Sequence, residues 1–217
     1  MSTPWVIGPN PDSSITYGNE SDQVIEFFGA NGPLIALIHG GYWRAKHNRE
    51  HMRALASKLA GDGFRVANLE YRREAGAPKK TTEDIKSALT KLPKLTAIVG
   101  FSVGGQLALL NANLAPKLIL LAPVTDLVRT KSENLGEGAV NEFFVDHDLD
   151  EFDPMTKRYN AKLLIIHGDK DQRVPIAHSR AFAKAQGAEL VEIPGADHFD
   201  VIDPNGTTVE IIKGFLA

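Results

Sequence analysis

Residues 96–105 read TAIVGFSVGG and decide the fold. The first four are small, apolar or β-branched residues, as expected of a buried strand, and an apolar helical pattern follows Ser102. Between them lies the pattern G-x-S-x-G in the strand-turn-helix context that exposes a serine on a sharp turn. A Cβ at Gly100 or Gly104 is expected to clash in so tight a turn. No Lys-Ser/Thr pair follows the glycines, which argues against a phosphate site and favours Ser102 as a nucleophile.

Strand and helix patterns alternate along the rest of the chain. Apolar runs predict strands at residues 34–38, 65–69, 96–99, 118–121, 163–166 and 189–193. Amphipathic patterns predict helices at 52–60, after Thr81 and Thr82 as capping residues, after Ser102, from Pro175 to about Gly187, and at 207–216. This alternation predicts a single α/β domain over residues 1–217, with a mostly parallel sheet and helices on both faces. Residues 130–157 interrupt the alternation and are predicted to form either a small lid or an ordinary surface loop.

The composition narrows the class of protein. The 217 residues carry a formal charge of −3 and no run of basic residues, so neither nucleic acid nor an anionic membrane is an expected partner. The absence of cysteine excludes disulfides and thiolate metal sites. No signal peptide or membrane-spanning run is evident, which predicts a cytoplasmic protein. We expect neither a metal nor a cofactor, and the oligomeric state is left open.

A base and an orienting acid follow two later strands. His198 comes after the strand at 189–193, and Asp171 follows the strand at 163–166 with the spacing G-x-x-D-x-x-V-P. The order serine, aspartate, histidine and the position just beyond the carboxyl ends of strands suit a catalytic triad. Asp169 and Asp197 are competing acids, but both are better suited to bracing a turn.

The remaining histidines are assigned structural or surface roles. His167 ends a buried strand and is predicted to be a structural histidine. His147 and His178 carry no pattern and are predicted to be solvated.

The stretch HGGYW at residues 39–43 follows the strand at 34–38. A turn of this kind offers backbone N–H groups to an oxyanion, here from Gly41 and Tyr42, with Val103 as the third donor. With these motifs, the chain from about residue 22 to 217 resembles the α/β-hydrolase superfamily.

A narrower resemblance rests on HGGYW, on GFSVGG at 100–105 and on GADHFDVI at 195–202, which are similar to the arylformamidase (kynurenine formamidase) family. It implies a serine hydrolase that cleaves an aryl formamide such as N-formylkynurenine, with Tyr42, Trp43 and Phe199 contacting the substrate. The chain is shorter than expected for that family.

Three alternatives remain. A short-chain carboxylesterase would keep the same triad, because fold does not fix substrate. A zinc hydrolase would use His47, Glu50 and His51, which fit H-x-x-E-H, but a third ligand at a recognised spacing is lacking and His51 falls where the apolar stripe faces the sheet. A non-catalytic small-molecule receptor could retain the fold.

Overall fold

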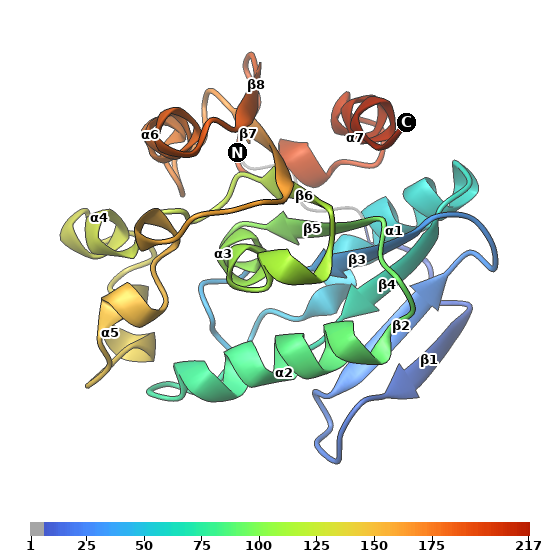
Figure 1. Cartoon of the computed structure of the whole chain (residues 1–217), viewed down its shortest axis with the longest axis horizontal. Helices are drawn as coiled ribbons and strands as arrows, with labels where there is room; N and C mark the ends of the chain where they lie inside the picture. The colour runs from blue at the N-terminus through green and yellow to red at the C-terminus, as the bar shows by residue number, and fades with distance from the viewer. Residues whose placement is uncertain (1–6) are drawn as a thin grey trace.

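The computed structural model describes residues 7–217 and is built on an eight-stranded sheet (Figure 1). The strand order is β1-β2-β4-β3-β5-β6-β7-β8, with β1 and β2 antiparallel to their neighbours and every other pair parallel. The strands are β1 Ser13–Thr16, β2 Val24–Phe28, β3 Leu34–Ile38, β4 Arg65–Leu69, β5 Ala97–Phe101, β6 Lys117–Leu121, β7 Lys162–Gly168 and β8 Glu189–Ile193. The predicted mostly parallel sheet is confirmed. The two antiparallel strands β1 and β2 were not predicted.

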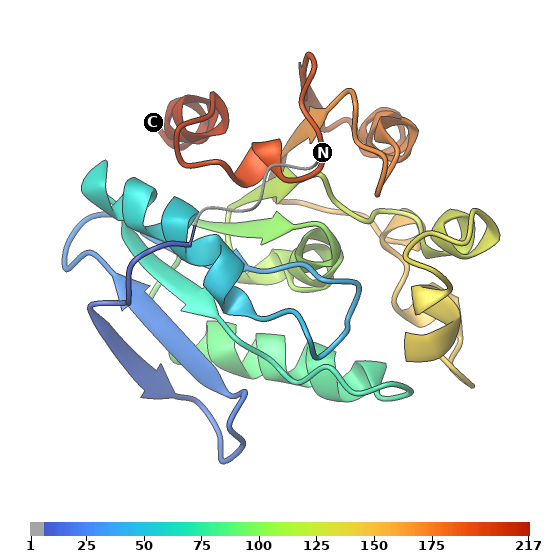
Figure 2. The same cartoon turned by 180° about the vertical axis from the view of Figure 1, so that it is seen from behind.

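Helices cover both faces of this sheet (Figures 1 and 2). One face packs against α1 Arg53–Gly61 and α7 Thr208–Leu216, and the other against α2 Pro78–Lys91, α3 Val103–Leu110 and α6 Ile176–Gln186. Successive strand residues point to opposite faces, so Leu37 joins the first core and Ala36 and Ile38 join the second. None of the described helices has both the length and the apolar character that crossing a membrane requires.

Two helix starts differ from the sequence prediction. Helix α2 begins at Pro78, before Thr81 and Thr82, because proline fits the first helical turn, where an N–H has no partner to lose. The Thr81 hydroxyl, inside the helix, donates to the carbonyl oxygen of Arg72 instead of capping. Helix α6 begins one residue after Pro175 and ends at Gln186, where it is followed by Gly187, whose φ of 66° suits glycine.

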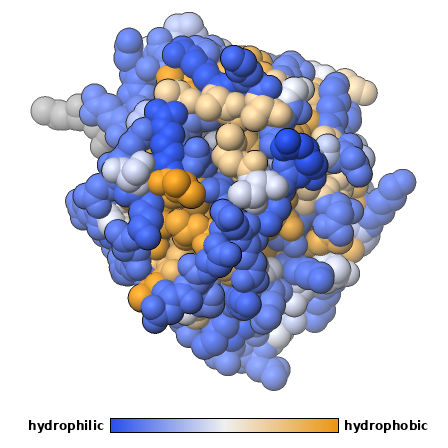
Figure 3. All heavy atoms as spheres, turned by 60° about the vertical axis from the view of Figure 1, so that its left-hand side comes forward, coloured by the Kyte–Doolittle hydropathy of each residue, from blue (hydrophilic) through white to orange (hydrophobic). Residues whose placement is uncertain are grey.

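The segment at residues 130–157 packs over the carboxyl ends of the strands. It contains the end of α4 Leu127–Ser132, α5 Ala139–Phe143 and two short 3-10 helices, Leu149–Glu151 and Pro154–Thr156. Its aromatic residues share a third apolar cluster with Trp43 and Val103. On this side of the molecule the surface is mostly hydrophilic, with apolar atoms exposed in a limited area (Figure 3). The segment lies where the predicted lid would lie, and a lid function remains a prediction.

Leu37 tests the packing of the sheet against α1 and α7. Its side chain is fully buried in the middle of β3. We expect Leu37→Ala to lower the free energy of unfolding by about 2–5 kcal/mol, because it leaves a cavity that the surrounding core cannot fill. Urea denaturation followed by circular dichroism measures this change. Val145→Ala, at a half-exposed position, is the control and should change stability by less than about 0.5 kcal/mol.

Candidate active site

Ser102 lies on a strained turn between β5 and α3. Its φ of 55° and ψ of −121° are unfavourable for a residue with a side chain. The turn is held by its neighbours: the Ser102 N–H donates to the carbonyl oxygen of Leu121 at 2.8 Å, and its own carbonyl oxygen accepts from Gly105 and Val124. A Cβ on Gly100 would lie 2.3 Å from the carbonyl oxygen of Gly104. Only glycine therefore fits beside this serine.

The loops after β7 and β8 bring Asp171 and His198 together. His198 Nδ1 lies 2.6 Å from Asp171 Oδ2, and both residues are buried. The other carboxylate oxygen, Oδ1, accepts the backbone N–H groups of Arg173 and Val174 at 2.8 and 2.9 Å. Burial opposes ionisation of Asp171, but the hydrogen bonds from His167 and His198 outweigh it and hold its pKa well below the usual range.

His167 is a second partner of the same carboxylate oxygen. Its Nε2 lies 3.0 Å from Asp171 Oδ2 and 2.9 Å from the carbonyl oxygen of Val174, and its Nδ1 lies 2.7 Å from the Ser179 hydroxyl. Since both neighbours of Nε2 are acceptors, Nε2 carries a proton and donates to them, while Nδ1 faces the Ser179 hydroxyl. The prediction of a structural histidine is confirmed, but its contact with Asp171 was missed.

Ser102, His198 and the turn after β3 line one small cavity of about 50 Å³. Its walls are Gly41, Tyr42, His47, His51, Phe101, Ser102, Arg173, His198 and Phe199. The two competing acids do not reach it: Asp169 accepts the N–H of Gly195, and Asp197 accepts the N–H of Phe199. Both brace turns, as predicted.

The turn after β3 has an unusual backbone. Gly41, Tyr42 and Trp43 have φ values of 119°, 48° and 55°. Within residues 7–217 the N–H groups of Gly41 and Tyr42 have no protein acceptor, and Val103 is the first residue of α3, so its N–H has no acceptor within the helix. These three groups are available to a bound oxyanion.

A buried polar cluster holds the first residues of this turn, His39 and Gly40. The two ring nitrogens of His39 lie 2.7 Å from the carbonyl oxygen of Gly40 and 2.9 Å from Glu70 Oε1. The Tyr71 hydroxyl donates to the carbonyl oxygen of His39 at 2.7 Å. Arg73 pairs with the same Glu70 carboxylate. The sequence did not reveal this cluster, because its partners come from the segment that follows β4 and not from the segment around His39.

The predicted substrate residues take different positions. Tyr42 lines the cavity, and its hydroxyl donates to the carbonyl oxygen of Arg173 at 2.6 Å, joining the oxyanion turn to the loop of Asp171. Phe199 also lines the cavity, and the Arg173 guanidinium carbon lies over its ring, 5.0 Å from the ring centroid. Trp43 is only 2% exposed and stacks on Phe143 at 5.3 Å between ring centroids. It reaches only a separate outer pocket of about 580 Å³.

The zinc alternative lacks a ligand set. His47 and His51 line the cavity, but Glu50 is exposed and pairs with Arg53 at 3.3 Å. Nowhere in residues 7–217 do three or more histidine or carboxylate side chains gather to hold a metal ion. The three residues of the H-x-x-E-H pattern therefore do not come together as a ligand set among residues 7–217.

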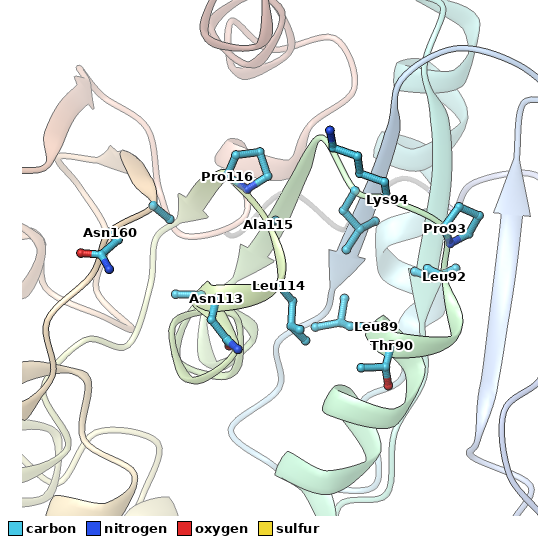
Figure 4. A pocket seen from close by; sticks show the side chains of 13 residues that line it. Leu89, Thr90, Leu92, Pro93, Lys94, Asn113, Leu114, Ala115, Pro116 and Asn160 are labelled. Atoms are coloured by element: carbon cyan, nitrogen blue, oxygen red, sulfur yellow. The ribbon is translucent and has the colours of Figure 1, made fainter.

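A groove of about 590 Å³ lies at the amino ends of strands β5, β6 and β7, opposite the end of the sheet that carries Ser102 (Figure 4). It runs from the end of α2 past the 3-10 helix Ala112–Leu114 to the residues before β7. Its lining is mostly apolar, with Lys94, Asn113 and Asn160 at the rim, and it holds no histidine or carboxylate. The groups able to do acid-base chemistry lie at the carboxyl edge instead.

The sheet, its helical layers and the serine turn after β5 define the α/β-hydrolase class. Residues 27–162 match the model of the BD-FAE family, and the chain belongs to this family. The protein is therefore a hydrolase of an esterase family.

Several solved structures of similar fold carry esterase or thioesterase descriptions. Esterase 2 of Thermogutta terrifontis, phosphonylated by sarin, superimposes with a TM-score of 0.79 at 20% identity, covering 94% of this chain and 93% of that one. A truncated carbohydrate esterase from gut microbiota has a TM-score of 0.78 at 17% identity over 96% and 98% of the chains. A putative thioesterase from Silicibacter sp. TM1040 has a TM-score of 0.74 at 23% identity over 93% and 86%. No curated protein matches the sequence.

These identities establish the fold only. Together with the family, they support the carboxylesterase interpretation better than the arylformamidase one.

The lowered pKa of Asp171 predicts how stability depends on pH. An unfolded aspartate titrates near pH 3.9, so the ionised, hydrogen-bonded Asp171 adds stability above about pH 4, and this contribution is lost as the pH falls further. We expect Asp171→Asn to be less stable than the wild type at pH 6, and the difference to shrink by pH 3. Urea denaturation at both pH values measures it. A difference that grew on acidification would contradict the assignment.

Proposed function

We propose that the protein hydrolyses esters of short acyl groups, with Ser102 as nucleophile, His198 as general base and Asp171 as the group that orients His198. One observation carries the proposal: a histidine bonded at 2.6 Å to a buried carboxylate shares a small cavity with a serine on a strained turn. A serine hydroxyl needs an adjacent base to attack a carbonyl, and the base needs a fixed tautomer.

The acylation step uses these three side chains in order. His198 Nε2 takes the hydroxyl proton as Ser102 Oγ attacks the ester carbonyl carbon. Asp171 holds the proton on Nδ1 and stabilises the imidazolium that forms. The imidazolium then gives its proton to the departing alkoxide, leaving the acyl group on Ser102 and releasing an alcohol.

The negative charge on the carbonyl oxygen goes to the backbone donors. The N–H groups of Gly41, Tyr42 and Val103 are the proposed oxyanion hole. Loss of one such donor typically costs a factor of about 10²–10³ in rate. Water, deprotonated by His198, attacks the acyl-enzyme in the second half of the reaction and releases the acid and free Ser102.

The size of the cavity favours a small acyl group. A volume of about 50 Å³ has room for only a few water-sized groups. The Thermogutta terrifontis esterase has been solved with propionate and with butyrate bound, and both are short-chain acids.

Hydrolysis of an aryl formamide such as N-formylkynurenine is the second candidate. The observation in its favour is the same small cavity, since a formyl group is smaller than an acetyl group. Comparing kcat/KM for p-nitrophenyl acetate, formanilide and N-formylkynurenine separates the two candidates. We expect the ester to be preferred by at least about tenfold, and the reverse order would favour the formamidase.

Replacing the serine tests the mechanism. Ser102→Ala should lower kcat for p-nitrophenyl acetate by at least about 10⁴-fold, because no other nucleophile can form the acyl-enzyme. The variant should also fail to react with a fluorophosphonate probe that labels the wild type. A variant that kept wild-type activity and labelling, with an unchanged circular dichroism spectrum, would rule out Ser102 as nucleophile.

A further inference from the structure

The two histidines of the H-x-x-E-H pattern are part of the catalytic cavity, although the proposed triad does not use them. The His51 ring lies edge-on to Phe101, the residue before the serine, at 5.9 Å between centroids, and it is 7% exposed. His47 packs against the oxyanion turn so closely that a Cβ on Gly41 would lie 2.4 Å from His47 Cβ. One imidazole therefore adjoins the residue before Ser102, and the other adjoins Gly41 of the proposed oxyanion hole.

We propose that His47 and His51 close the acyl end of the cavity and thereby set the longest acyl chain that the enzyme accepts. This inference rests on the proposed esterase function and adds the residues that determine its acyl specificity. The measurable consequence is a steep fall in kcat/KM as the acyl chain lengthens.

The acyl group, and not the alcohol, is the fragment that suits the enclosed cavity. The alcohol must leave and water must enter before the acyl group is released, so the alcohol side needs a path to solvent. Such space lies beyond Tyr42, whose ring lines both the small cavity and the outer pocket of about 580 Å³. The acyl group stays bonded to Ser102 throughout, next to Phe101 and the two histidines.

The wall formed by the two histidines is uncharged at neutral pH. Burial lowers the pKa of His51 to about 3, and burial also lowers the pKa of His47. A neutral imidazole can pack against the hydrocarbon part of an acyl group without the cost of desolvating a charge. The pair is therefore suited to contact an apolar chain.

The backbone that carries the histidines is fixed, so the wall cannot easily retreat. The Asn48 side chain accepts the N–H of Glu50 at 3.0 Å at the start of the 3-10 helix Arg49–Met52. The N–H of Arg49 donates to Glu70 Oε2 at 3.1 Å, and Arg53 binds the buried Glu26 carboxylate. A rigid wall excludes a longer chain instead of adapting to it.

The experiment compares His51→Ala and His47→Ala with the wild type. His147→Ala is the matched control, because it removes the same side chain from a residue that does not line the cavity. One substrate series varies the acyl group as p-nitrophenyl acetate, butyrate and hexanoate. The other keeps the acetyl group and varies the alcohol from methyl to hexyl acetate.

We expect the hexanoate-to-acetate ratio of kcat/KM to rise by about tenfold or more in His51→Ala and His47→Ala, and to stay constant in His147→Ala. The ratio within the alcohol series should not change in any variant. Unchanged acyl ratios in folded variants would overturn the proposal, and so would a change confined to the alcohol series.

Folding and function are separated by two further readouts. Thermal melts identify a variant that does not fold. If His51→Ala does not fold, His47→Ala still tests the proposal, because His47 is only half-buried. A wild type that hydrolyses no ester of either series would refute the esterase function itself, and a fully active Ser102→Ala would refute Ser102 as its nucleophile.

Discussion

The close approach of three backbone segments at Ser102 is the constraint on which the site depends. A Cβ on Gly104 would lie 2.1 Å from the carbonyl oxygen of Ile38, and a Cβ on Gly40 would lie 2.8 Å from Ser102 Cβ. The start of α3 is thereby pressed against the end of β3, which places the serine beside the turn at Gly41. The strain at Ser102 persists because the surrounding strands and helix over-determine its conformation.

Two buried polar systems hold the groups on either side of this serine. On one side, the chain from Ser179 through His167 and Asp171 reaches His198, and every member is buried. On the other, Glu70 and the residues bonded to it hold His39 at the base of the oxyanion turn. Unpaired, such groups would destabilise the fold, so the hydrogen bonds among them also fix their geometry.

Sequence patterns predicted the elements whose signal is local. The six predicted strands and the turn at Ser102 have such signals, since apolar runs and glycine spacing act over a few residues. β1 was missed because its four residues are exposed and owe their strand conformation to pairing with β2. The prediction that His178 is solvated is wrong: it is 1% exposed and bonds Glu133, which lies 45 residues earlier. Contacts between distant residues leave no local pattern.

The H-x-x-E-H pattern shows why spacing alone did not identify the chemistry. Spacing of four residues places two imidazoles on one side of a helix, but His47 lies before the 3-10 helix Arg49–Met52 and the intervening Asn48 is extended. The two histidines share the cavity wall because of the path of this loop, and not because of helical spacing. A metal needs a third ligand and a carboxylate aimed at the same point, whereas Glu50 points to Arg53 at the surface. What faces the two histidines is Phe101 and Ser102, brought there by β5. Their role therefore depends on the sheet that positions the serine, and not on their own sequence pattern.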